Sequence, residues 1–435
     1  MADNLPRFGA DDFYLTQTDP LALRESLRSA LAEVLGRPVL DSDPHMVLAS
    51  AFLPFLAQGQ ASADAAAKAT LRAFAVGQDL DRIAESTCVV GYMDRLAPRG
   101  AVLACILSVG VTRPTPLEAA TVTVTWTASR DVEADGETVT FSGSGSFVIP
   151  YDAGVLTKSL KLPIYLVCGT VGSAYNGLLS STATVPVPDS EISVSVSAVD
   201  DGGAACTVSS VAVSRCGSTY GGSDLESDES FAERSAWQAK ALRVSGSYEY
   251  FRLLLSELSL LASSYVAPSV DADGRIVMAW CDKAAYYAGK AGIQLDDRGA
   301  AYGAFREAVQ GSLLVEQRVM AYPAREDAAA LYSVRYWLPA STVDVASARA
   351  AVERAWRAYV SAHAWQCGAI FSTAEMCAVV LAAGASSATV QTAEDVYIVL
   401  PADTIITDRQ LGLVYRGLST DAAAPAGGDG EEITP

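Results

Sequence analysis

A glycine pair, Gly221-Gly222, divides the chain into two kinds of sequence. Before it, residues 101–216 contain runs in which polar and apolar residues alternate, such as 121–126, and Gly and Pro separate these runs. Alternating runs that Gly and Pro separate are typical of β-strands. After it, residues 251–261 place apolar side chains at helical spacing. Because glycine adopts dihedral angles that other residues avoid, we predict that Gly221 and Gly222 form a hinge between a β-rich and a helical region.

Acidic residues follow the glycine pair closely. They are Asp224, Glu226, Asp228 and Glu229. Ser227 or Asp228 can cap the helix that starts here, and the helix dipole favours acids in its first turn. We interpret the group as capping and solubilising residues, which makes a cation site the weaker hypothesis.

The hydrophobic pattern along all 435 residues predicts a multidomain α+β protein. The expected parts are an N-terminal helical segment (1–98), a β-rich, sandwich-like domain (99–222), two α+β domains (223–340 and 341–418) and a tail (419–435). The tail carries acids and no bases among mostly Ala, Gly and Pro, so we expect it to be disordered.

Amphipathic helices are the candidates for contacts with other chains. In the N-terminal segment we expect helices over about 21–35, 44–58 and 62–76, and a further one from Gly77. Another helix, over about 344–364, carries an aromatic stripe. The candidate interface residues are Leu23, Leu27, Leu31, Leu80, Trp356 and Tyr359. The N-terminal helices have more apolar surface than they can bury alone, which favours packing against partner helices.

Several short segments occur in an order that is informative. They are 77–84 with 91–95 and 99–101, then 169–177, then 221–234, then 266–268 with 274–277. Together these segments resemble the central signature of the baseplate J family, the wedge proteins of contractile phage tails and related injection machines. The resemblance covers roughly residues 70–285, and each segment taken singly is a weak signal.

The resemblance implies a structural protein and not an enzyme. In that family two copies of the chain associate with one copy of a smaller, I-like wedge subunit, and the N-terminal helices bundle with it. The C-terminal domains then join into a ring, usually sixfold, around the central hub and spike, with a sheath-initiator protein beside the wedge. The ring would relay the trigger for sheath contraction. The protein would assemble in the bacterial cytoplasm and become part of the baseplate of a virion or injection particle.

Composition excludes some partners and compartments. The net charge of −19 and the pI of about 4.5 argue against nucleic-acid binding, which needs a basic surface. No apolar run reaches the ~20 residues of a membrane span, so none is expected. The first 13 residues lack the apolar core of a signal peptide. The eight cysteines contain no Cys-x-x-Cys pair, and free thiols are the favoured interpretation, with one disulfide left open.

Candidate chemical groups are few, and we assign no catalytic, cofactor or metal residue. His45 and His363 are isolated, and residues 271–274 fit a hairpin turn better than a calcium loop. The serine-rich run 142–146 lacks the lysine of a phosphate-binding loop. Two alternatives remain open: a receptor- or glycan-binding protein that acts through its β domain, and a hydrolase of unknown type.

Overall fold

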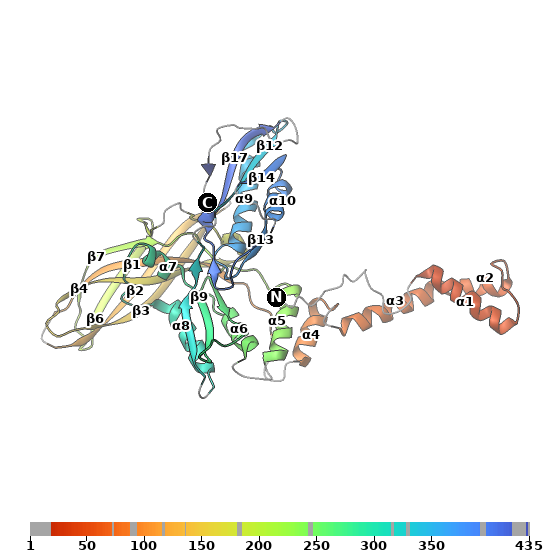
Figure 1. Ribbon diagram of the computed structural model, residues 1–435, viewed down its shortest axis with the longest axis horizontal. Helices are drawn as coiled ribbons and strands as arrows, with labels where there is room; N and C mark the ends of the chain where they lie inside the picture. The colour runs from red at the N-terminus through yellow and green to blue at the C-terminus, as the bar shows by residue number, and fades with distance from the viewer. Residues whose placement is uncertain are drawn as a thin grey trace. The chain divides into compact units, whose positions relative to one another are not determined.

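The computed structural model describes most of the chain (Figure 1). The described residues are 19–71, 74–87, 94–114, 118–134, 136–180, 185–241, 247–314, 317–327, 331–391, 397–419 and 432–433. The chain forms two compact units. The first joins Met1–Leu96 to Glu226–Arg243, and the second joins Ala97–Leu225 to Val244–Pro435. The multidomain α+β class is therefore confirmed, but the helix after the glycine pair belongs with the N-terminal helices and not with the α+β domain that follows.

The first unit is helical. Its helices are α1 (Pro20–Leu35), α2 (Pro44–Ser50), α3 (Leu53–Ala69), α4 (Gly77–Thr87) and α5 (Asp228–Ala241). Side chains of Asp19 and Asp43 cap α1 and α2, and a proline follows each cap. Pro54 lies in the first turn of α3, where its missing N–H costs no hydrogen bond. The helix expected to start near residue 62 is therefore the second half of α3.

The β-rich domain expected from the sequence is one curled antiparallel sheet (Figure 1). Its strands are β1 (Gly100–Thr112), β2 (Ala120–Ala134), β3 (Glu137–Tyr151), β4 (Thr157–Val171), β5 (Val187–Pro188), β6 (Ser193–Asp200) and β7 (Thr207–Arg215). They lie in the order β5-β7-β1-β4-β3-β2-β6. Strands β6 and β7 are consecutive in sequence and pair mainly with β2 and β1, and the turn that joins them is closed by an antiparallel bridge between Val199 and Ala205.

Strand β1 is the centre of the second unit because both of its faces are buried. Leu103 and Leu107 face the core of the curled sheet. Val102 and Ile106 belong to a second core, shared with the α+β part of the unit. A strand covered on both faces reads as a continuous apolar run, which is the pattern of residues 101–107.

The α+β part begins with α6 (Tyr248–Ser256) and a three-stranded sheet of order β10-β9-β8. Its strands are β8 (Ser263–Val266), β9 (Ile276–Cys281) and β10 (Val319–Pro323). Helices α7 (Lys283–Lys290) and α8 (Gly299–Ser312) connect β9 to β10 and contact β1 and β4. Helix α7, which Asp282 caps, is not among the helices expected from the sequence. Two-residue strands β11 (Arg325–Glu326) and β16 (Thr404–Ile405) pair in parallel.

The last sheet has the order β14-β12-β17-β18. Its strands are β14 (Ser387–Gln391), β12 (Tyr332–Pro339), β17 (Leu411–Ser419) and β18 (Glu432–Ile433). Helices α9 (Val345–His363) and α10 (Thr373–Ala382) pack against it (Figure 1). Because β12 pairs with β14 and β17, the expected boundary at residue 340 is wrong. Strands β13 (Ile370–Ser372) and β15 (Tyr397–Val399) pair as a small antiparallel ribbon, and β13 directly precedes α10 in the sequence.

Parts of the expected picture lie outside the described residues. These are residues 420–431 and 434–435 of the tail, and 91–93 of one motif. Within the tail the described pair Glu432–Ile433 is strand β18, which pairs with Leu413 and Val414. Seven cysteines are described and all are free, as expected, whereas Cys88 lies outside the described residues.

Candidate functional site

Three of the sequence motifs meet in the second unit, close to the glycine pair. The backbone of Arg99 exchanges hydrogen bonds with Ser223. The side-chain amide of Asn176 donates to the carbonyl of Gly222 at 2.7 Å and accepts from its N–H at 2.8 Å. The hydroxyl and N–H of Ser173 both donate to Asp224. Segments around residues 99, 173–177 and 219–224 therefore form one hydrogen-bonded junction.

The junction explains why glycine occupies both positions of the pair. Gly221 has φ of +76°, in the left-handed region. A Cβ atom on Gly222 would lie 2.5 Å from the carbonyl oxygen of Gly172 and 2.9 Å from the side-chain oxygen of Asn176. Close approach of backbone segments is thus a sufficient reason for Gly222. Motion at this pair, which the sequence suggested, stays a prediction.

We predict that Gly222→Ala destabilises the second unit by about 1–3 kcal/mol, because the added methyl group has no room beside backbone atoms. The free energy of unfolding in urea measures this. Gly59→Ala is the matched control: Gly59 lies within α3 and a Cβ there meets nothing within 4 Å. That control should stabilise by up to about 1 kcal/mol. Equal effects of the two substitutions would contradict the packing account of Gly222.

Three of the four acids after the glycine pair have specific partners, so capping and solubility do not account for them alone; Glu229 is exposed and lies with Asp228 in the first turn of α5, as expected. Asp224 accepts from Ser173, as described above. In the helical unit, Glu226 pairs with Arg234 at 2.6 Å, and both side chains are buried. Asp228 pairs with Arg95, also at 2.6 Å, and accepts from the N–H of Gly77. The cap of α5 is Ser227, whose hydroxyl accepts from Ser230 N–H.

Arg95 and Arg234 organise this ionic cluster. Arg95 also binds Asp81 at 2.8 Å, and both guanidinium groups lie over the ring of Phe231. Burial raises the pKa of Glu226, but hydrogen bonds from Arg234 and from the backbone N–H of Leu96 outweigh burial and hold it below its usual value. The ionised pair therefore ties α5 to the chain near residue 96.

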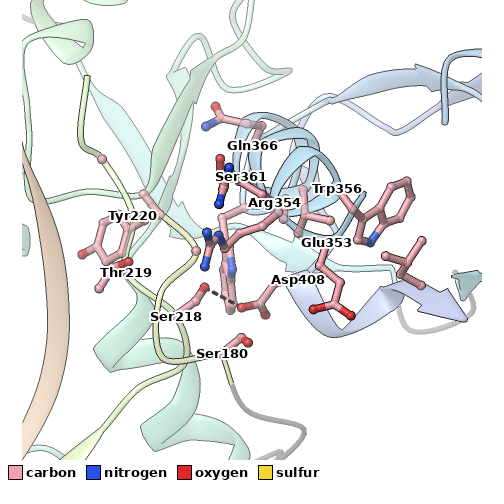
Figure 2. Close-up of a pocket in the computed structure, with 18 of the residues that line it drawn as sticks. Ser180, Ser218, Thr219, Tyr220, Glu353, Arg354, Trp356, Ser361, Gln366 and Asp408 are labelled. Carbon is pink, nitrogen blue, oxygen red and sulfur yellow. Dashed lines mark hydrogen bonds between the residues drawn. The ribbon is translucent and has the colours of Figure 1, made fainter. Parts of the chain in front are cut away.

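A cavity of about 370 Å³ lies in the second unit between α9 and residues 218–221 (Figure 2). The hydroxyl of Ser218 donates to Asp408 at 2.6 Å, and the ammonium of Lys283 donates to the carbonyl and hydroxyl oxygens of Ser218 at 2.9 and 3.2 Å. Figure 2 shows Glu353, Arg354 and Ser361 of α9 on the side opposite Ser218–Tyr220.

Lys283 is wholly buried in the wall of this cavity. Its ammonium lies 4.6 Å from the ring centre of Trp365 and 4.8 Å from that of Tyr220. Burial lowers the pKa of Lys283 to about 8, although Asp408 opposes the change. Burial also raises the pKa of the neighbouring Asp282 to about 6, opposed by the hydroxyl of Tyr165. Both groups are buried with hydrogen-bond partners, as buried polar groups require.

The Ser218–Lys283 contact has the composition of a serine–lysine dyad, and it bears on the hydrolase alternative. A hydrolase also needs backbone N–H groups that stabilise an oxyanion. The two N–H groups that follow Ser218 are already committed: Thr219 N donates to Leu178 and Tyr220 N donates to Val102. The Ser218 hydroxyl is itself bound to Asp408. This geometry favours a structural role for the dyad, which together with Asp408 joins three chain segments.

The sequence matches no protein-family model, and no curated protein matches it. The resemblance to the baseplate J family therefore stays a prediction that rests on the motifs.

The interface candidates of the sequence analysis are mostly buried within the chain. Leu23 and Leu80 are buried in the helical unit, and Leu27 and Leu31 are half-buried there. Trp356 and Tyr359 lie in the core of the second unit, 3% and 6% exposed, and the Trp356 indole donates to the carbonyl of Leu411. Trp356 and Tyr359 are therefore core residues and not contact residues, because α9 turns its aromatic stripe toward β17.

Other side chains of the helical unit are exposed and apolar. They are Leu21, Val34, Leu40, Val47, Leu48, Phe52, Phe55, Leu56, Leu71 and Val76. We call this set the apolar surface of the helical unit. Phe52 and Phe55 are 64% and 72% exposed. The amphipathic pattern predicted these helices. The exposed side chains are not the leucines at helical spacing, because those leucines pack against neighbouring helices.

The remaining sequence candidates have local roles. His45 is exposed and contacts Asp43, and the His363 ring contacts the carbonyl of Tyr359. Residues 271–274 form the turn between antiparallel strands β8 and β9, as expected. In the described part of the chain, no group of three or more His, Cys, Asp or Glu could hold a metal ion. No helix there is long and apolar enough to cross a membrane.

The β domain bears on the glycan-binding alternative. Its outward face carries exposed hydroxyl groups on β2, β3 and β6, around a shallow groove of about 670 Å³. Aromatic side chains, which stack on sugars, are not exposed among the described residues of 97–225: Trp126 is 5% exposed, and Tyr175 is half-buried. The support expected for this alternative is thus missing from the described β domain.

Proposed function

We propose that this protein is a structural wedge component of a contractile tail or injection machine, and that it works by assembly with other protein chains. The observation that carries the proposal is the apolar surface of the helical unit. Exposed apolar side chains recur along this unit from Leu21 to Val76, and apolar surface that a partner can cover marks interaction sites. The unit is built from amphipathic helices, so a helical partner is the natural complement.

The order of motifs supports the same assignment. Segments that resemble the baseplate J signature lie far apart in sequence, yet three of them meet at the junction of Arg99, Asn176 and Gly222. Residues 77–81 also share one ionic cluster with Asp228 in the helical unit. These contacts give the segments a structural role in the fold, which fits a scaffold protein.

The proposed assembly follows from the family. Two copies of this chain would bind one copy of the smaller, I-like wedge subunit through the helical unit. The second unit would join wedges into a ring around the hub and spike, near the sheath initiator. Its β13–β15 ribbon exposes Ile370, Tyr397 and Val399, and these side chains offer an apolar contact for ring formation. The ring would pass the trigger to the sheath.

The test is co-expression with the smaller wedge subunit, followed by native mass spectrometry. We expect a 2:1 complex, and we expect the chain alone to self-associate. The double variant Phe52→Gln, Phe55→Gln should lose the complex while its helices keep their circular dichroism, because both rings are exposed in the isolated chain.

The matched control is Tyr397→Gln, since Tyr397 is an equally exposed aromatic residue that belongs to the second unit. This variant should still bind the smaller subunit. A stable monomer that ignores the subunit, or complex formation that survives the double substitution, would contradict the proposal.

A further inference from the structure

Two cysteines that are distant in sequence lie close together in the α+β part of the second unit. Strand β8 pairs with β9 so that Ser263 lies opposite Cys281. Side chains directly opposite in an antiparallel pair project to the same face, with Cβ atoms about 4.5–5.5 Å apart. The Ser263 hydroxyl oxygen lies 3.3 Å from the sulfur of Cys367 and accepts the N–H of Cys367 at 3.2 Å. Ser263 therefore has one thiol opposite it in the sheet and the other against its side chain.

The two thiols share one environment. Cys281 is 3% exposed and Cys367 is half-buried, and both pack in the same hydrophobic core. Burial raises the pKa of the Cys281 thiol well above its ordinary value, and the neighbouring Cys367 raises it further. Burial also raises the pKa of Cys367, opposed by the hydrogen bond with Ser263. Cys367 is thus the thiol that solvent can reach, and Cys281 lies behind it.

Backbone hydrogen bonds hold the chain around Cys367 in place. The N–H groups of Trp365 and Gly368 donate to the carbonyls of residues 406 and 404. The Ser263 hydroxyl donates to the carbonyl of Trp365 at 2.5 Å. A thiol fixed beside a second thiol reacts with it as an intramolecular partner, at an effective concentration that no dissolved thiol reaches. This arrangement favours a bond within the chain over a bond to another molecule.

We propose that Cys281 and Cys367 form a reversible disulfide bond when the protein meets a peroxide. The Cys367 thiolate attacks one oxygen of hydrogen peroxide, the O–O bond breaks, and the sulfur becomes a sulfenic acid while the other oxygen leaves as water after taking up a proton. The Cys281 thiolate then attacks the Cys367 sulfur, and the hydroxyl group leaves as a second water. Two thiols thus lose two protons and two electrons, and the peroxide gains them.

The bond would tie β9 to the segment that follows α9. A crosslink between residues far apart in sequence stabilises a fold chiefly by restricting the unfolded chain. We expect the oxidised protein to melt about 5 °C or more above the reduced protein, and dithiothreitol to reverse the change. Because the cytosol keeps thiols reduced, the bond would form after the chain leaves such a compartment. The inference does not depend on the assembly role.

The test is peptide mapping of the full chain by mass spectrometry after treatment with hydrogen peroxide and alkylation of the remaining thiols. We expect one peptide pair joined through Cys281 and Cys367, two hydrogen atoms lighter than the separate peptides, which dithiothreitol separates. The rate of bond formation should rise about tenfold from about pH 7 to about pH 8, because the thiolate fraction of a thiol with a raised pKa rises by that factor.

Two variants assign the reaction to this pair. In Cys281→Ala the sulfenic acid of Cys367 has lost its partner, so dimedone, which traps sulfenic acids, should label Cys367 in this variant and much less in wild type. Cys377→Ser is the matched control, because Cys377 is also a half-buried thiol but lies on α10, and the bond should form as in wild type. Three results would each overturn the proposal: no Cys281–Cys367 bond after prolonged treatment, equal pairing of Cys367 with other cysteines, or equal dimedone labelling of wild type and Cys281→Ala.

Discussion

Replacing Trp356 with alanine is expected to lower the free energy of unfolding of the second unit by about 3–5 kcal/mol. The ring is 3% exposed, stacks on Tyr359 with ring centres 5.3 Å apart, and donates to the carbonyl of Leu411. Alanine leaves a cavity and an unpaired carbonyl between α9 and β17. Urea unfolding followed by circular dichroism measures the change.

Two further variants make this prediction specific. Trp356→Phe keeps most of the ring and should cost clearly less than alanine. Val343→Ala should be neutral within about 0.5 kcal/mol, because Val343 is 99% exposed. If Trp356→Ala leaves the unfolding free energy unchanged and only blocks assembly, the helix carries an interface instead of a core.

Breaking the buried ion pair of the helical unit should have an effect of similar size. Arg234→Met leaves Glu226 as a buried carboxylate without its partner, and such losses cost about 3–5 kcal/mol. Arg234 also donates to the carbonyl of Asp94, so the substitution loosens the chain before residue 97. Hydrogen exchange of the amides of residues 228–236 measures the local stability.

Arg234→Lys is the matched control for this prediction. It keeps the charge but loses the two-point contact, in which Nε and Nη2 bind separate oxygens of Glu226 at 2.9 and 2.6 Å. In Arg234→Lys, the protection of these amides against hydrogen exchange should therefore lie between that of wild type and that of Arg234→Met. If Arg234→Met exchanges as slowly as wild type, Glu226 is stabilised by other groups and the cluster has no central ion pair.

The elements that the sequence predicts well are those that depend on local pattern. The alternation of residues 121–126 is reproduced in β2, where Val122 and Val124 are buried between exposed threonines. Asp344 caps α9, at the expected start of that helix. Proline and capping signals set these bounds because they act within one helical turn.

The errors arise where distant segments pair. The local sequence does not predict that β12 pairs with β14 and β17, because tertiary packing determines which strands pair. The acids at 226 and 228 look like capping residues because their partners, Arg234 and Arg95, can be identified only in the folded chain. Lys283 follows directly after the buried strand β9 and the capping residue Asp282, and that position is the one sequence signal that could have pointed to the cavity.

The most direct test of the assembly role is cryo-electron microscopy of particles made by the cells that express this chain. The account predicts density for the chain in a ring around the central spike, with the helical unit packed against a smaller subunit and two copies of the chain per such subunit. Intact, contracting particles whose baseplate contains no copy of this chain would contradict the central claim.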